Sequence, residues 1–213
     1  MDYILNITFF ILKGSIITFK LYIVTAIFSV ILGVLGALGK ISGIKFLERI
    51  LGIYTWVFRG TPLLLQIFFA YYGLPVLGIT LQPFTAAALT FIFNYGAYLV
   101  EIFRAGIESI DKGQYEAAKV LGMNYRQTMF RIIIPQTIKR ILPPSSNEAI
   151  NLVKDSALVA AIGLGDLLRA AKVIVTRDFT ILPFVIATIF YLIISSVIVT
   201  IFKRLERKFS VYE

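Results

Sequence analysis

The chain has 213 residues, of which 58% are hydrophobic and 14% are aromatic, and it contains neither Cys nor His. Soluble domains average about 45–50% apolar residues, so this composition indicates a membrane protein. The lack of Cys and His excludes disulfides, thiol nucleophiles, most zinc sites and imidazole acid–base chemistry. The 21 Lys and Arg residues outnumber the 12 Asp and Glu residues. Basic loops on the cytoplasmic side of a membrane explain this excess without nucleic acid, and we predict no metal site.

The first half of the chain contains three expected membrane spans. Residues 21–38 form an uncharged run, and the apolar residues 3–20 before it fit either an interfacial helix or the first turns of this span. The second span, residues 50–72, is interrupted by Arg59-Gly60-Thr61-Pro62. There we expect Thr61 to cap a new helix and Pro62 to be its first residue. The third span covers residues 84–103.

The second half contains two more expected spans, which makes five in an all-α membrane protein. The fourth begins at Pro143-Pro144 and reaches residues 163–165, and the fifth covers residues 181–202. Between them, residues 166–180 are expected to form an outer connector.

The positively charged residues predict the orientation. The connectors at 39–49, 104–141 and 203–213 together carry 14 Lys and Arg residues, whereas the connector at 166–180 carries only three. Because positive residues accumulate in the cytoplasm, we expect the N-terminus outside and the C-terminus inside. Residues 104–141, the cytoplasmic segment, would then face the cell interior.

The cytoplasmic segment has the local signals of two short helices. Residues 114–121 contain good helix formers, and Gly122 is placed to end that helix in a left-handed conformation. Asn124 is a candidate N-cap, with Gln127 three residues later completing a capping box. We expect this second helix to stop at Pro135.

Glu116-Ala117-Ala118, Gly122 and Ile132-x-Ile134-Pro135 together resemble the EAA loop of bacterial ABC importer permeases, with Ile134 in the usual place of Leu. The run from Ala97 to Gly106 is similar to the polar-amino-acid branch of these permeases, the basic or arginine type most of all. The resemblance implies a type I ABC importer permease fold. It also implies a single transmembrane domain over residues 1–213, with the coupling loop at 104–141. The residues implied to couple to an ATPase are Glu116, Ala117, Ala118, Leu121, Gly122, Ile132, Ile134 and Pro135.

The same resemblance implies a set of partners in the bacterial cytoplasmic (inner) membrane. These are a second permease subunit, identical or related, two cytoplasmic ATPase subunits and an extracytoplasmic amino-acid-binding protein. The chain has no Gly-x-x-x-x-Gly-Lys-Ser/Thr motif. We therefore predict that it is not an enzyme and binds no cofactor, and that ATP and Mg²⁺ belong to the partner ATPase.

Polar residues gather on one face of the expected fourth span. At 100° per residue they fall within an arc of about 120°, and the members are Asn147, Glu148, Asn151, Lys154 and Asp155. Charges expected near mid-membrane mark a pathway by default, although a salt-bridge network that only joins helices is the alternative. The run from Lys154 to Val159 also resembles a signature of the amino-acid permeases.

A second polar stripe, Asn94, Tyr98 and Glu101, has i, i+4, i+7 spacing in the third span. We assign Asn94 and Tyr98 to the substrate pathway with Glu148, Asn151, Lys154 and Asp155. Glu101 has Arg104 at i+3, which predicts an ion pair. Arg59 needs a partner such as Glu101 or backbone carbonyls. The expected gate or scaffold residues are Arg59, Thr61, Pro62, Glu101 and Arg104.

The predicted function is ATP-driven import of polar amino acids by alternating access. Glu148, Lys154 and Asp155 sum to one negative charge, which favours a basic substrate (arginine, lysine or histidine). The same importer carrying glutamine or glutamate is an alternative. A different class, an ion-coupled carrier, would use Asp155 and Lys154 as a proton relay, but carriers usually contain internal repeats and none is visible here.

Overall fold

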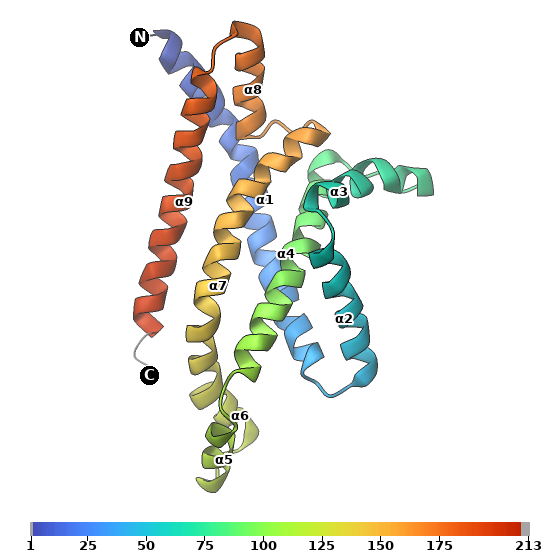
Figure 1. Ribbon diagram of the computed structural model, residues 1–213, viewed down its shortest axis with the longest axis vertical. Coiled ribbons are helices and arrows are strands. Elements are labelled where there is room, and N and C mark those ends of the chain that lie inside the picture. The colour runs from blue at the N-terminus through green and yellow to red at the C-terminus, as the bar shows by residue number, and fades with distance from the viewer. Residues whose placement is uncertain (1, 210–213) are drawn as a thin grey trace.

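The computed structural model describes residues 2–209, and every regular element in that range is helical (Figure 1). This confirms the expected all-α architecture. In chain order the elements are α1 (Asp2–Lys40), α2 (Lys45–Gly60), α3 (Leu63–Phe68), the π-helical turn η1 (Phe69–Gly73), the 3-10 turn η2 (Leu74–Leu77), α4 (Pro83–Glu108), α5 (Lys112–Val120), α6 (Tyr125–Thr128), the π-helical turn η3 (Met129–Ile133), α7 (Ile134–Asp155), the 3-10 helix η4 (Ser156–Ile162), α8 (Leu167–Asp178) and α9 (Leu182–Phe209).

Within residues 2–209, three helices are long and apolar enough to cross a membrane, namely α1, α4 and α9. The pair formed by α2 and the run from α3 to η2 bends by 105° at its break and is a fourth span if the two parts count as one. The expected fourth span corresponds to α7, whose polar face makes it less apolar than these helices. It nevertheless packs against α4 and α9. Five spans therefore remain a prediction.

The N-terminal residues form one helix rather than two elements. α1 runs for 39 residues without a break, so residues 3–20 are the first turns of the span and not a separate interfacial helix. At 1.5 Å per residue this helix is about 58 Å long, longer than the ~30 Å hydrocarbon core. Lys13 and Lys20 are both exposed on it, as charged side chains near a membrane boundary should be.

Three prolines, Pro135, Pro143 and Pro144, do not interrupt the helix as expected. α6 passes through η3 into α7, so Pro135 lies in the first turn of α7 and Pro143 and Pro144 lie inside it. The expected stop at Pro135 and the expected start at Pro143 are therefore wrong. Proline fits the helical φ, and Pro135 lies just after the π-helical turn η3, where the regular i→i−4 hydrogen-bond pattern is already interrupted. Beside Pro135, side chains bond to neighbouring carbonyls: Thr137 Oγ1 donates to the Ile133 oxygen at 2.9 Å.

The expected outer connector is also helical. Residues 167–178 form α8, and its N-cap is Asp166, whose carboxylate accepts from the backbone N–H of Leu168 at 3.1 Å and of Arg169 at 3.0 Å. Such a cap compensates the unpaired N–H groups of a first turn. Because Asp166 is fully buried, α8 is held firmly against the helix bundle.

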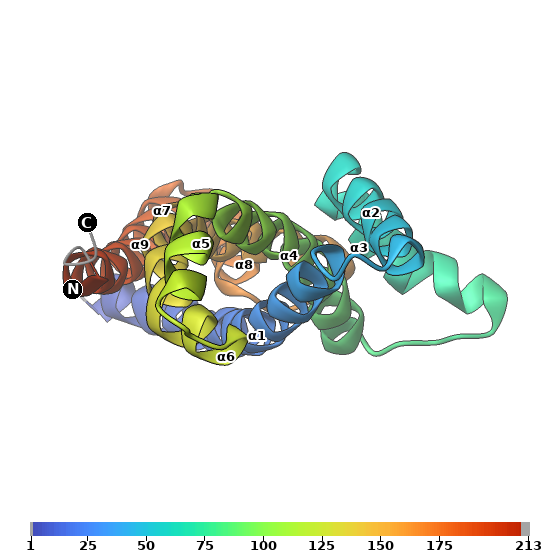
Figure 2. The ribbon, with the colours of Figure 1, turned by 90° about the horizontal axis from the view of Figure 1, so that it is seen from below.

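The ends of the molecule carry different elements. In Figure 1, α8 and the N-terminal end of α1 lie at one end, and α5 and α6 lie at the opposite end. Figure 2, seen from the α5–α6 end, shows α2 and α3 projecting sideways from the bundle of α1, α4, α7 and α9. This arrangement places the two turns around Gly122 and Asp166 at opposite ends of α7.

Close packing of α1 against α4, the largest helix–helix interface, depends on small residues. A Cβ added at Gly33 would lie 2.7 Å from the Leu99 Cβ and 3.0 Å from the Phe103 ring. Since no rotamer change moves a Cβ atom, Gly33→Ala would force the helices apart. At Gly52, by contrast, an added Cβ meets nothing within 4 Å.

We predict that Gly33→Ala destabilises the protein by about 1–3 kcal/mol, the usual range for overpacking. The matched control Gly52→Ala should be neutral or should stabilise α2 by up to about 1 kcal/mol, because Ala is the better helix former. Thermal unfolding of the detergent-solubilised protein measures both variants. Equal midpoints would show that Gly33 does not set the α1–α4 distance.

Candidate functional site

The break between α2 and α3 is held together by the amide side chains of Asn94, which is buried, and Gln66, which is half-buried. The Asn94 amide, 5% exposed, donates to the Phe58 carbonyl at 2.9 Å and to Gln66 Oε1 at 3.0 Å. The Gln66 amide in turn donates to Phe58 O at 2.9 Å and to Thr61 Oγ1 at 2.7 Å. The last backbone carbonyls of a helix have no partner within that helix. Inside a membrane no water can bind them, so other groups of the protein must do so. Asn94 therefore supports the broken span from α4.

Thr61 and Pro62 have other positions at this break than the sequence pattern predicts. Thr61 ends α2, and its hydroxyl donates backwards to the Val57 carbonyl at 2.9 Å. Pro62 occupies the cap position of α3, which begins at Leu63 without a side-chain cap. The expectation that Thr61 is the N-cap of α3 is therefore wrong. The Thr61 hydroxyl instead binds a carbonyl in the last turn of α2.

A polar seam joins α4 and α7 beside this break. Tyr95 on α4 donates its hydroxyl to Asp155 Oδ2 at the end of α7, at 2.7 Å. Tyr98, one turn further, packs its ring 5.4 Å below the Arg59 guanidinium, a cation–π distance. Glu148 precedes Asp155 by seven residues on α7 and therefore lies about two turns away on the same face of that helix. Arg59 is therefore paired with Tyr98, and its expected partner Glu101 has other contacts.

The polar stripe of α7 divides into two groups. Glu148, Asn151 and Asp155 are half-buried, whereas Asn147 and Lys154 are exposed. Among residues 2–209 the recorded ion pairs include none within this stripe. The hydrogen-bond partner of Asp155 is Tyr95, a residue outside both sequence stripes, which the sequence pattern did not reveal.

A cavity of about 230 Å³ opens beside Glu148, between α1, α4, α7 and α9. Its polar lining consists of Tyr22, Ser29, Tyr95, Ser145 and Glu148. The buried hydroxyl of Ser145 has no hydrogen-bond partner within the described chain. Unpaired buried polar groups are rare. The cavity thus combines an acid with an unpaired donor.

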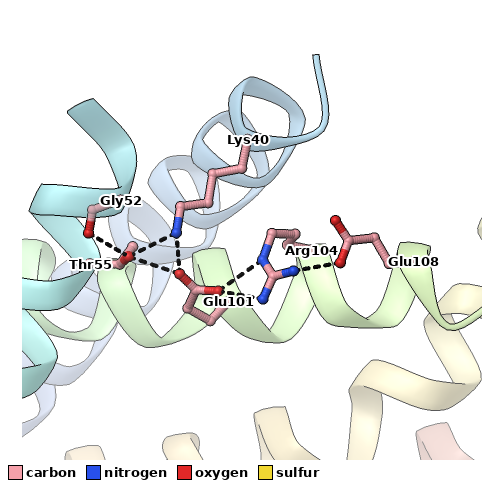
Figure 3. A network of polar contacts seen from close by, with 6 residues as sticks. All are labelled: Lys40, Gly52, Thr55, Glu101, Arg104 and Glu108. Atoms are coloured by element: carbon pink, nitrogen blue, oxygen red, sulfur yellow. Dashed lines mark hydrogen bonds and ion pairs between the residues drawn. The ribbon is translucent and has the colours of Figure 1, made fainter. Parts of the chain in front are cut away.

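A second polar cluster lies at the α5–α6 end of α4 (Figure 3). Glu101 accepts hydrogen bonds from Lys40 of α1 and, at 2.8 Å, from Thr55 of α2. Its other oxygen pairs with Arg104 at 2.9 Å, and Arg104 also pairs with Glu108. The expected Glu101–Arg104 ion pair is confirmed.

This cluster, the Glu101 cluster, fastens three helices at one point. The side chains of Lys40 and Glu101 are 13% and 15% exposed. Lys40 and Thr55 precede Glu101 by 61 and 46 residues. No pattern within one helix could have identified them, and Lys40 read as an ordinary loop charge.

The turn between α5 and α6 has the predicted local structure. Gly122 has a left-handed φ of 71°. Asn124 Oδ1 accepts from Gln127 N–H at 2.9 Å, and Gln127 Oε1 accepts from Asn124 N–H at 2.9 Å, which confirms the capping box. The first helix is Lys112–Val120, slightly earlier than expected, and is capped by Asp111.

The coupling residues named from the sequence fall into two groups. Ala118 is fully buried, and Ile132 and Ile134 pack around the buried side chains of Ile110, Met129 and Ile133. Glu116, Ala117, Leu121 and Gly122 are exposed, and Pro135 is half-buried. Large apolar side chains are unusually exposed around this turn, with Val120 at 87% and Leu121 at 77%. An exposed apolar patch of this kind is typical of a protein-binding surface.

Comparison with known proteins covers nearly the whole chain. The family described as binding-protein-dependent transport system inner membrane component matches residues 29–211. The arginine transport system permease protein ArtQ of Bacillus subtilis (strain 168) is 44% identical over 201 residues, 93% of this chain and 92% of that protein. The putative glutamine transport system permease protein GlnP of Rickettsia bellii (strain RML369-C) is 40% identical over the same shares.

Solved structures agree with this assignment. An amino acid ABC transporter crystallised with histidines contains a chain that is 37% identical, with a TM-score of 0.89 over 97% of both chains. The inward-facing MetNI methionine ABC transporter is 18% identical, with a TM-score of 0.77 over 94% of this chain and 96% of the other, and shows a shared fold. The chain therefore belongs to the family of binding-protein-dependent transport system inner membrane components, as an ABC transporter permease with the type I importer fold.

Proposed function

We propose that this protein imports polar amino acids across the bacterial cytoplasmic membrane as one of two facing permease subunits. ATP hydrolysis, with its Mg²⁺, is assigned to two separate cytoplasmic ATPase subunits, and substrate delivery to an extracytoplasmic binding protein. Support comes from the family and from relatives named as arginine and glutamine permeases. The charge distribution supports an orientation with the α5–α6 end in the cytoplasm and the α8 end outside.

Movement of the ATPase would be transmitted to the substrate site through one continuous helical segment. The exposed apolar side chains at the α5–α6 turn supply the ATPase-binding surface. From α6 the helix continues through η3 and α7 to Asp155 without a gap. Movement of the turn would therefore displace α7 as a rigid body. The Glu101 cluster would hold α1 and α2 to α4, so that Glu148 and Asp155 move against a fixed frame.

The charges at the polar seam are the observation that carries the substrate class. Glu148 and Asp155 suit an ammonium or guanidinium group, and Arg59 and Lys154 suit a carboxylate. Glu148, Lys154 and Asp155 alone leave one negative charge, which favours arginine. Arg59 brings the sum to zero, which favours a neutral zwitterion such as glutamine equally well. Of these charged residues only Glu148 also lines the cavity of about 230 Å³, which is smaller than the roughly 300–1,000 Å³ sites of drug-sized ligands and suits a single amino acid.

Replacing one acid of the polar seam should show whether the substrate is arginine or glutamine. We expect Glu148→Gln to weaken arginine binding about tenfold, since a hydrogen bond to a charged group is worth about 1.5–3 kcal/mol and 1.4 kcal/mol is tenfold. Asp155→Asn should have a similar effect if Asp155 receives the other cationic group. Calorimetric titration of the permease–ATPase complex in nanodiscs measures the affinity of each variant for arginine and for glutamine.

The control is Asn147→Ala, an exposed position on the same helix, which should leave binding unchanged. If Glu148→Gln weakens arginine and spares glutamine, the substrate is basic. If both acid variants bind both amino acids like the wild type, the seam is not the substrate site. Uptake supported by an ion gradient without ATP would instead establish the carrier alternative.

A further inference from the structure

A second, larger cavity lies at the α8 end of the chain. Its volume is about 1010 Å³, and its walls are α8, η4 and the run from α3 into η1. Arg169, Lys172 and Arg177 line it from α8, and Tyr71 and Tyr72 line it from η1. No acid among residues 2–209 lines it. A cavity with this lining, the outer cavity, suits an anionic group beside an apolar body.

Arg169 is held in place by the backbone around it. The buried carboxylate of Asp166 binds the Arg169 N–H at 3.0 Å and fixes the first turn of α8. The Arg169 guanidinium lies over Gly163, with Nη1 2.9 Å from the position that a Cβ would occupy. Gly163 also has a left-handed φ of 85°. Only Gly allows both features, so this chain turn positions the guanidinium at the cavity wall.

The cations of the outer cavity differ in their pairing. Arg177 forms two bonds to Asp178, at 2.6 and 2.8 Å, and is locally neutralised. Within residues 2–209, Arg169 and Lys172 take part in none of the recorded ion pairs. Asp166, the nearest acid in sequence, is fully buried and is occupied by backbone N–H groups and by Tyr191. Two unneutralised positive charges therefore face the cavity.

The outer cavity lies beyond the end of α7, and the residues of the polar seam are not part of its lining. Its floor is formed by Ala157, Leu158 and residues 160–163, the first of which is two residues after Asp155, and α3 packs against η4. A molecule moving inward from this cavity would therefore meet the end of α7. The two sites differ in charge, since the outer one is cationic whereas the inner one combines the acids Glu148 and Asp155 with Arg59 and Lys154.

We propose that the outer cavity is a distinct binding site for the α-carboxylate of the incoming amino acid, with Arg169 and Lys172 as the binding groups and Tyr71 and Tyr72 as the apolar wall. This inference rests on the proposed function and on the orientation given above. The carboxylate would bind here first, before the substrate moves inward to Glu148 and Asp155. The substrate would thus be recognised at one end before the other.

The test uses the permease–ATPase complex in nanodiscs and ligands that differ only in the carboxylate. The probes are L-arginine with L-argininamide, and L-glutamine with L-glutaminamide. In the Glu148→Gln variant, whose inner site is weakened, the remaining binding of the free amino acid should depend on the outer cavity. There we expect Arg169→Gln to weaken binding about tenfold, the effect of losing one charge-assisted contact. The amides should bind weakly throughout.

Arg177→Gln is the matched control, because it removes the same kind of side chain from the same helix and cavity but one already paired with Asp178. It should leave binding unchanged. Arg169→Lys should restore most of the affinity, and Lys172→Gln provides a second variant if Arg169→Gln does not fold.

Equal losses in Arg169→Gln and Arg177→Gln, equal losses for acid and amide, or no residual binding in Glu148→Gln would each overturn this inference and leave the proposed function intact. A wild-type complex that binds neither arginine nor glutamine would overturn both.

Discussion

The Gly122→Val permease is expected to lose its ATPase partner while it still folds and inserts. Gly122 has a left-handed φ of 71°, and an added Cβ would meet nothing within 4 Å. The penalty is therefore one of backbone conformation, about 1–2 kcal/mol for an L-residue and greater for a β-branched one. A free turn relieves this strain by changing the angle between α5 and α6, which misplaces the docking surface. Affinity for the ATPase should fall about tenfold or more, since 1.4 kcal/mol is a factor of ten.

A nearly identical glycine provides the control. Gly43, in the turn between α1 and α2, has a φ of 75° and also has nothing within 4 Å of an added Cβ. Gly43→Val therefore carries the same backbone penalty at a turn outside the docking surface. The measurement is co-purification of the ATPase with each permease variant, together with ATP-dependent uptake. If Gly43→Val loses the ATPase as completely as Gly122→Val, the α5–α6 turn is not the specific contact.

Removal of Glu101 should cause the largest loss of stability. In Glu101→Ala the Lys40 ammonium, on a side chain only 13% exposed, loses its acid partner, and Arg104 loses one of two. Breaking a buried ion pair from one side costs about 3–5 kcal/mol, because the remaining charge stays desolvated. We therefore expect a clear drop in the thermal midpoint and separation of α1 and α2 from α4. Thermal unfolding in detergent measures the first effect.

Glu108→Ala is the matched control, because Glu108 also pairs with Arg104 but its side chain is 50% exposed. Exposed pairs contribute about 0–1 kcal/mol, so this variant should unfold close to the wild type. Adding Lys40→Met to Glu101→Ala removes the unpaired buried cation and should recover part of the stability. If Glu101→Ala and Glu108→Ala unfold alike, the Glu101 cluster does not hold the three helices together.

The features that the sequence determined alone are those formed within one stretch of backbone. The left-handed Gly122 and the Asn124–Gln127 capping box depend only on residues within three positions of each other. Composition likewise predicted a membrane protein, and the long apolar runs predicted helical spans, because a bilayer requires every backbone group to be paired internally. The Gly122 turn and the capping box need no partner helix, because all their hydrogen-bonding groups lie within the same turn of backbone.

The tertiary structure decided whatever depends on two helices meeting. It carried one helix through Pro135, Pro143 and Pro144, and that helix packs against α4 and α9. It also gave Asp155 its partner Tyr95, 60 residues away, and Glu101 its partner Lys40, 61 residues away. Periodicity places a side chain on a face but does not say which helix lies opposite that face. That is settled by the close packing of α1, α4 and α7, because burying their polar groups is favourable only where partners meet.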